Sequence, residues 1–254
     1  LLLYGKLPDQ AEFDAYVERL KTMRGLPSAL KETLEKIPAD SHPMDVLRTG
    51  CSVLGNIEPE GDFANQADVA DRLLAVFPSI LIYWYRYHAD GVRIDTETDD
   101  DSVAGHFLHL LHGEAPVERH RKALDVSLIL YAEHEFNAST FTARVIAATL
   151  SDFHSAVTGA IGALRGPLHG GANEAAMELI ERFQDAESAH SGTLDALARK
   201  EKIMGFGHRV YSTKDPRAHN LQTLMRELFS THGSTPLYDL AVRLEEEVVK
   251  HLGS

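Results

Sequence analysis

The sequence predicts an all-α fold. Apolar residues recur with a helical period along almost the whole chain, whereas the alternating runs typical of strands are nearly absent. Residues that commonly start or stop helices flank these periodic segments. The 254 residues are 44% hydrophobic and 25% charged, a composition typical of a globular protein with a sizeable core. No window reaches the roughly 18 uninterrupted apolar residues of a membrane-spanning helix.

The expected helices follow one another with apolar residues three or four positions apart. The first lies between a start signal at Asp9 and a stop signal at Gly25. The second opens at Pro43 and is expected to end at Gly55, and Pro78 predicts a kink in the third. The segments predicted to be helical are residues 13–20, 43–55, 69–80, 103–111, 123–131, 138–150, 153–164 and 173–183.

The domain organisation is indicated by a change of character near Gly166, where glycines cluster and the later sequence becomes more polar. We therefore expect a large helical domain over residues 1–166 and a smaller one over residues 167–254. The chain begins at Leu1 rather than Met, and its first four residues resemble the end of a helix. We expect it to be the middle part of a longer protein.

Charge and cysteine content exclude several function classes. The 25 Lys and Arg against 38 Asp and Glu give a net charge of −13, which argues against nucleic acid or an anionic membrane as a partner. The single cysteine, Cys51, excludes a disulfide framework and a Cys-ligated zinc site. A reducing, cytoplasmic location is the simplest interpretation.

Three histidines that are spaced three residues apart on one predicted helix are candidate metal ligands. His106, His109 and His112 lie at i, i+3 and i+6, so two of them can share a helix face. This spacing fits either a metal site or, more commonly, a His-rich interface. No His-Glu-x-x-His zinc motif, nucleophile elbow or phosphate-binding loop accompanies them. We expect no bound metal.

Two polar corners stand out between the apolar helices. Residues 131–140 contain His134 and Asn137 at a break between two helices, which predicts either a structured corner or a ligand site. Residues 166–174 place His169 among glycines directly before a helix. Glycines let the backbone approach a ligand closely, and a helix N-terminus disfavours a cationic imidazole. A neutral His169 there suits hydrogen-bond donation to a developing oxyanion.

A third corner holds a histidine and an arginine. His208 follows the glycines of Gly205-Phe206-Gly207, and Arg217 stands behind the turn at Asp215-Pro216. Arginine binds carboxylates through two parallel hydrogen bonds, although a structural pair with an aspartate is an equally good interpretation of Arg217. Histidines with an arginine, and without a nucleophile or redox motif, suit a small dicarboxylate or keto acid. They also suit a reaction that builds charge on a carbonyl oxygen.

These three segments, in this order on an all-α chain, resemble the citrate synthase family. The likeness covers essentially the whole chain, and within the family it is greatest to the 2-methylcitrate synthases of bacterial propionate breakdown. That finer likeness depends on the segments 83–85, 97–102, 106–114 and 131–140.

The resemblance implies a role for each site residue. His169 would hydrogen-bond the thioester carbonyl of acyl-CoA, and His208 would polarise the ketone of oxaloacetate. His134 and Arg217 would hold oxaloacetate, and Asn137 would shape the corner around it. Tyr131 would lie near the acyl group. Backbone groups of Met204, Gly205, Phe206 and Gly207 would face coenzyme A.

The resemblance also implies the reaction and its partners. Propionyl-CoA or acetyl-CoA would condense with oxaloacetate through an enol(ate), and thioester hydrolysis would release 2-methylcitrate or citrate and CoA. Coenzyme A would enter as part of a substrate, without any cofactor, in a homodimer whose small domain closes over the substrates.

Departures from the family occur at both ends of the chain. The family's catalytic base is an aspartate beyond the region of Val248, in a segment that this chain does not contain. One alternative is therefore an inert helical fragment that dimerises or binds oxaloacetate. A His-ligated metal hydrolase is a third, weaker hypothesis.

Overall fold

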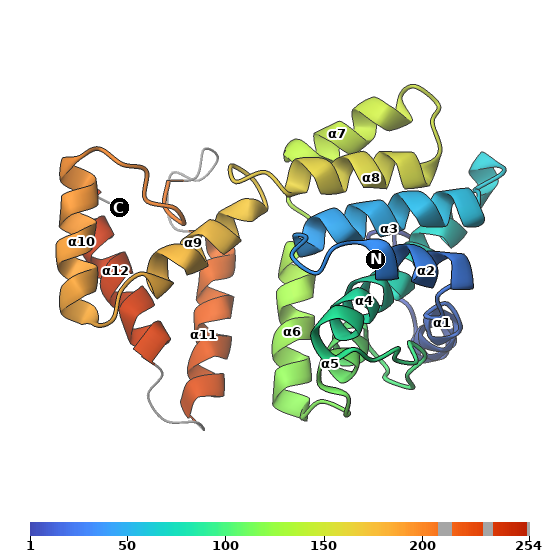
Figure 1. Ribbon diagram of the computed structural model, residues 1–254, viewed down its shortest axis with the longest axis horizontal. Coiled ribbons are helices and arrows are strands. Elements are labelled where there is room, and N and C mark those ends of the chain that lie inside the picture. The colour runs from blue at the N-terminus through green and yellow to red at the C-terminus, as the bar shows by residue number, and fades with distance from the viewer. Residues whose placement is uncertain (208–214, 231–235, 253–254) are drawn as a thin grey trace. The chain divides into compact units, whose positions relative to one another are not determined.

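The computed structural model describes residues 1–207, 215–230 and 236–252 (Figure 1). Within these ranges the chain is helical and contains no strand, so the predicted all-α fold is confirmed. The helices are α1 (Gln10–Thr22), α2 (Ser28–Lys36), α3 (Pro43–Ile57), η1 (Phe63–Asn65), α4 (Gln66–Asp90), α5 (Val103–His112), α6 (Glu118–Tyr131), α7 (Ala138–Ala147), α8 (Phe153–Leu164), α9 (Gly171–Glu181), α10 (Ala186–Ala198), α11 (Pro216–Ser230) and α12 (Pro236–Leu252).

The chain divides into two compact units, Leu1–Arg165 and Gly166–Ser254. In the first unit, α3 and α8 lie side by side and α7 packs along α8 (Figure 1). In the second unit, α12 packs against α9 and α10. Among the residues described in both units, no helix is both long and apolar enough to cross a lipid bilayer.

Helix α4 is the centre of the first unit. Twelve of its 25 residues are buried, and helices α1, α2, α3, α5 and α8 all contact it. The core around it includes Leu30 and Leu34 of α2, a helix that the sequence analysis did not predict although its apolar residues lie four apart. The helix is continuous through Pro78, where a kink was expected.

Glycine in α3 has a packing role that differs from the expected one. Gly55 was predicted to end the helix, but α3 continues to Ile57, so that prediction is wrong. A Cβ atom at Gly55 would lie 2.7 Å from the Cβ of His154, and one at Gly50 would lie 2.5 Å from Cγ2 of Ile80. These glycines therefore allow α8 and α4 to approach α3 closely, and they do not mark a terminus.

A buried carboxylate fastens the start of the chain to α4. Asp71 is fully buried and accepts hydrogen bonds of 2.7 Å from the hydroxyls of both Tyr4 and Tyr16. Arg19 lies 3.2 Å from the same carboxylate. The hydrogen bond to Asp71 raises the pKa of Tyr4, and burial together with Asp71 raises that of Tyr16. A buried charge that is paired and hydrogen-bonded in this way is costly to disturb.

We predict that Asp71→Asn lowers the free energy of unfolding by about 2–3 kcal/mol. The substitution replaces a charged carboxylate, which accepts hydrogen bonds from both tyrosine hydroxyls, by a neutral amide with a single acceptor oxygen. Asp68→Asn is the matched control, because Asp68 is 66% exposed and pairs with the same Arg19 at 2.6 Å. The Asp68→Asn substitution should lower the free energy of unfolding by less than about 1 kcal/mol. Urea unfolding of both variants measures the difference, and equal losses would contradict the anchoring role of Asp71.

Candidate functional site

The corner around His169 is a compact turn that runs directly into α9. The carbonyl of Gly166 accepts hydrogen bonds from the backbone N–H groups of His169 (2.9 Å) and Gly171 (3.1 Å). Gly171 is the first residue of α9, and the carbonyl of His169 accepts from Ala172 at 3.0 Å. The half-buried His169 therefore lies two residues before a helix N-terminus, as the sequence predicted.

The corner between α6 and α7 is structured by Asn137. Its side-chain oxygen accepts from the backbone N–H of Thr140 (3.0 Å) and from the Ser139 hydroxyl (2.8 Å), so Asn137 is the N-cap of α7. Its amide group also donates to the carbonyl of His134 at 3.4 Å. This geometry fixes the backbone of His134 relative to α7. Of the two alternatives for this segment, the structured corner is present, and ligand binding stays a prediction.

Tyr131 is the last residue of α6 and is 53% exposed. The exposed residues Ile129 (71%) and Phe136 (71%) flank it in sequence. The acyl-binding role predicted for Tyr131 is not tested by this placement.

The loop before residue 208 depends on its glycines. Gly205 and Gly207 have φ values of +94° and +77°, a left-handed conformation that other residues adopt at a cost. Between them Phe206 packs against the cluster of Ile203, Leu244 and Val248. The loop over Met204 to Gly207 is thus anchored at its centre. His208 lies outside the described residues, so its predicted role is untested.

Arg217 is engaged in a pair within its own turn. Its Nε and Nη2 atoms donate to the two carboxylate oxygens of Asp215 at 3.0 and 2.7 Å, and its backbone N–H donates to Asp215 Oδ1 at 2.9 Å. The structural pair that the sequence left open is therefore present at the start of α11. The same two-pronged geometry is the one by which arginine binds a carboxylate ligand.

The predicted residues divide between the two units. Tyr131, His134 and Asn137 belong to the first unit, whereas His169, the loop over residues 204–207 and Arg217 belong to the second. Within its unit each lies at a helix end or in a corner between helices, which is where functional side chains are commonly placed.

The three spaced histidines of α5 have three different environments. His106 is 1% exposed, and its ring nitrogens lie 3.0 Å from the hydroxyls of Ser79 and Thr98. His109 pairs with Asp100 at 2.7 Å, and His112 is exposed. The interpretation as a His-rich interface is wrong for His106, which belongs to the core beside α4.

Burial, together with the nearby guanidinium of Arg24, lowers the pKa of His106 to about 3, so its ring is neutral at physiological pH. Arg24 is itself buried and donates to the backbone carbonyls of Thr98 and Asp100 at 2.7 and 2.6 Å. This network fastens the irregular segment before α5 to the core. In the part of the chain that the structure describes, no group of three or more His, Cys, Asp or Glu side chains is arranged to hold a metal ion.

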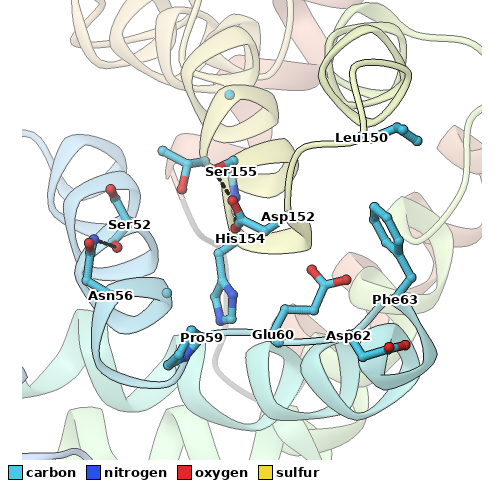
Figure 2. Close-up of a pocket in the computed structure, with 14 residues that line it drawn as sticks. Ser52, Asn56, Pro59, Glu60, Asp62, Phe63, Leu150, Asp152, His154 and Ser155 are labelled. Atoms are coloured by element: carbon cyan, nitrogen blue, oxygen red, sulfur yellow. Dashed lines mark hydrogen bonds between the residues drawn. The ribbon is translucent and has the colours of Figure 1, made fainter.

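A pocket that the sequence did not indicate lies in the first unit (Figure 2). It has a volume of about 710 Å³ and is formed by α3, the loop that follows α3, the turn between α7 and α8, and the start of α8. Of the predicted site residues in the first unit, Tyr131, His134 and Asn137 do not line it. Its histidine, His154, and one of its three carboxylates, Glu60, come from segments 94 positions apart, so sequence spacing alone gave no signal.

Known proteins resemble this chain in both sequence and fold. A family model described as citrate synthase, C-terminal domain, matches residues 1–253. A 2-methylcitrate synthase of Shewanella oneidensis is 63% identical over 245 residues, covering 96% of this chain and 65% of that enzyme. A citrate synthase of Heyndrickxia coagulans is 41% identical, covering 94% of this chain and 65% of that enzyme.

The solved structures that resemble the chain include a ternary complex of carboxymethyl coenzyme A and oxaloacetate with citrate synthase from Thermoplasma acidophilum. It superposes with a TM-score of 0.92 at 31% identity, covering all of this chain and 67% of that one. Citrate synthase from Thermotoga maritima has a TM-score of 0.86 at 37% identity, with 98% and 65% covered. The chain thus spans about two thirds of the length of the proteins that it matches.

The neutral, buried state of His106 predicts a pH dependence of stability. Below pH about 6.5 the unfolded chain protonates this histidine, whereas the folded chain keeps it neutral until about pH 3. The free energy of unfolding should therefore fall as the pH drops through that window, by up to about 1.4 kcal/mol per pH unit from this group. In His106→Gln the slope should be smaller by that amount, and in the exposed control His112→Gln it should be unchanged. Urea midpoints measured between those pH values test this, and equal slopes in all three proteins would refute it.

Proposed function

Because this chain belongs to the citrate synthase family, we propose that the protein condenses an acyl-CoA with oxaloacetate. The α-carbon of the acyl group loses a proton to a base and forms a bond to the ketone carbon of oxaloacetate, while the π bond of the ketone breaks and its oxygen takes up a proton to become a hydroxyl. Water then hydrolyses the thioester to release the tricarboxylate and coenzyme A. The observation that carries this proposal is the 63% identity to a 2-methylcitrate synthase over 96% of the chain.

Propionyl-CoA is the proposed preferred donor, with 2-methylcitrate as product, and acetyl-CoA is the second donor. The ranking follows the higher identity to the 2-methylcitrate synthase of Shewanella oneidensis (63%) than to the citrate synthase of Heyndrickxia coagulans (41%). Tyr131, at the end of α6, is the proposed contact to the acyl group. The reaction needs no metal or prosthetic group, and we place it in the cytoplasm and in a homodimer.

His169 is the proposed stabiliser of the enol(ate). His169 lies two residues before α9, and the positive end of a helix dipole disfavours an imidazolium close to it. A neutral ring can donate a hydrogen bond to the thioester oxygen as negative charge develops there. His208 is proposed to act in the same way on the ketone oxygen of oxaloacetate. We assign the base that removes the α-proton to none of this chain's residues.

Oxaloacetate carries two carboxylates, and Arg217 with His134 is proposed to bind it. The pair with Asp215 already holds the guanidinium of Arg217 in a two-pronged geometry. Asn137 orients the backbone of His134 by donating to its carbonyl. Backbone groups of Met204, Gly205, Phe206 and Gly207 are proposed to face coenzyme A, and the packing of Phe206 would keep that loop in place.

Thiol release tests the proposed reaction directly. The natural protein should release CoA thiol from propionyl-CoA and from acetyl-CoA only when oxaloacetate is present, with the higher kcat/KM for propionyl-CoA. Absence of release with both donors would refute the reaction, and a preference for acetyl-CoA would refute the proposed ranking. The 254-residue chain should also be assayed by itself, because the alternative hypothesis is that it is a catalytically inert helical fragment.

We predict that His169→Gln lowers kcat in this assay by about 10²–10³-fold, the usual loss when one donor to an oxyanion is removed. His219→Gln is the control, since His219 is an exposed histidine of α11 in the same unit. It should leave kcat unchanged. Equal activity of the His169→Gln variant and the natural protein would remove His169 from the mechanism.

Arg217→Lys should raise KM for oxaloacetate about tenfold while kcat changes less, because lysine cannot reproduce the planar fork. Arg199→Lys is the matched control in the same unit, because Arg199 forms a two-pronged pair with Glu201 at 2.7 and 3.3 Å on the surface. It should behave as the unsubstituted protein. If Arg217→Lys left KM unchanged, the pair with Asp215 would be purely structural.

A further inference from the structure

The pocket beside α3 and α8 contains two buried polar side chains that lack partners. His154 is 3% exposed and Glu60 is 7% exposed, and both line the pocket. Among the described residues, neither ring nitrogen of His154 nor the Oε1 atom of Glu60 has a hydrogen-bond partner. Buried polar groups in native proteins are nearly always paired, so unpaired ones that line a pocket indicate a ligand.

Among the described residues, only one of the two carboxylate oxygens of Glu60 accepts a hydrogen bond. Its Oε2 atom accepts from the backbone N–H of Phe153, the first residue of α8, at 2.5 Å. Figure 2 shows the side chain rising from the loop after α3 toward the start of α8. The second oxygen is thereby held in a buried position beside the pocket, with no donor among the described residues.

His154 occupies space that a glycine provides. The Cβ atom that any other residue would place at position 55 would lie 2.7 Å from the Cβ of His154 and 2.8 Å from its Cγ. Burial lowers the pKa of His154, so the ring is neutral at physiological pH. A neutral imidazole has one nitrogen that accepts a hydrogen bond and one that donates.

The charge of the pocket selects the kind of ligand. The described residues that line it include the carboxylates of Glu60, Asp62 and Asp152 and no lysine or arginine. The basic residue Arg72, which influences His154, is engaged by both oxygens of Glu58 at 2.8 Å. An anionic ligand such as a CoA ester or a dicarboxylate is therefore disfavoured there, and a cation is favoured.

An organic cation fits better than a metal ion. Asp62 caps η1 through the backbone N–H of Ala64, and Asp152 caps α8 through that of Ser155, so these carboxylates are already used. The described residues offer no set of three metal-ligating side chains. The pocket volume of about 710 Å³ is that of a small-molecule site. Its rim includes the exposed apolar side chains of Phe63 and Leu150.

We propose that this pocket binds a small protonated aliphatic amine. The ammonium group donates one hydrogen bond to Glu60 Oε1 and another to a ring nitrogen of His154, and the alkyl chain lies toward Phe63 and Leu150. The proposal does not depend on the condensation reaction, because the residues of the first unit assigned to that reaction, Tyr131, His134 and Asn137, do not line the pocket.

Titration calorimetry with propylammonium chloride on the natural protein tests the proposal. Propylammonium should bind saturably at millimolar concentration. Propanol, which lacks the charge, and tetramethylammonium, which lacks N–H donors, should bind at least about tenfold more weakly. In a nuclear magnetic resonance spectrum of the imidazole protons, the His154 signal should move with the same dissociation constant as the calorimetric signal.

Glu60→Gln should weaken propylammonium binding about tenfold or more, because it removes the charge and keeps an amide oxygen for Phe153. Glu32→Gln is the control, an exposed glutamate of α2 outside the pocket with the same change of net charge. It should not alter binding. His154→Gln is a second variant, which should also weaken binding, and circular dichroism confirms that each variant is folded.

Four results would overturn the proposal. One is the absence of saturable binding of propylammonium to the natural protein. Another is equal affinity for propanol or tetramethylammonium. A third is an equal loss of affinity in the Glu32→Gln and Glu60→Gln variants. Tighter binding of Zn²⁺ or Mg²⁺ that requires both Glu60 and His154 would assign the pocket to a metal and would overturn it as well.

Discussion

The burial of helix α4 is the constraint on which the first unit depends. An apolar helix surrounded by five others cannot also carry polar groups unless each of them is paired. Its two deepest polar residues meet this requirement with partners from distant segments. Asp71 accepts from Tyr4 and Tyr16, and Ser79 meets His106 of α5. Both the start of the chain and the segment before α5 are thereby tied to the same helix.

The second constraint is the close approach of neighbouring helices at positions where glycine has no side chain. Gly50 and Gly55 allow α3 to approach α4 and α8, and Gly159 allows α8 to approach α7, where a Cβ would lie 2.2 Å from Cδ1 of Ile146. The pocket of Glu60 and His154 lies at the start of α8, beside the contact at Gly55. Its shape therefore follows from packing rather than from any motif.

Local features of the structure could be predicted from sequence, whereas features that depend on distant residues could not. The helix start at Asp9 has a side-chain cap, and the corner at His169 leads into a helix, because each is decided by a few neighbouring residues. The role of Gly55 and the burial of His106 depend on helices far away in the sequence. The pair between Arg217 and Asp215 was foreseeable because these residues are two positions apart. The pocket was not, because its lining comes from segments far apart in the sequence.

The central proposal is that the protein uses His134, His169 and Arg217 to condense an acyl-CoA with oxaloacetate. A crystal structure of the natural protein with oxaloacetate and carboxymethyl coenzyme A tests it most directly. We expect His134 and Arg217 to lie within hydrogen-bonding distance of oxaloacetate oxygens and His169 to contact the carbonyl-derived group of the CoA analogue. Ligands bound away from these three side chains, with Arg217 contacting only Asp215, would contradict it.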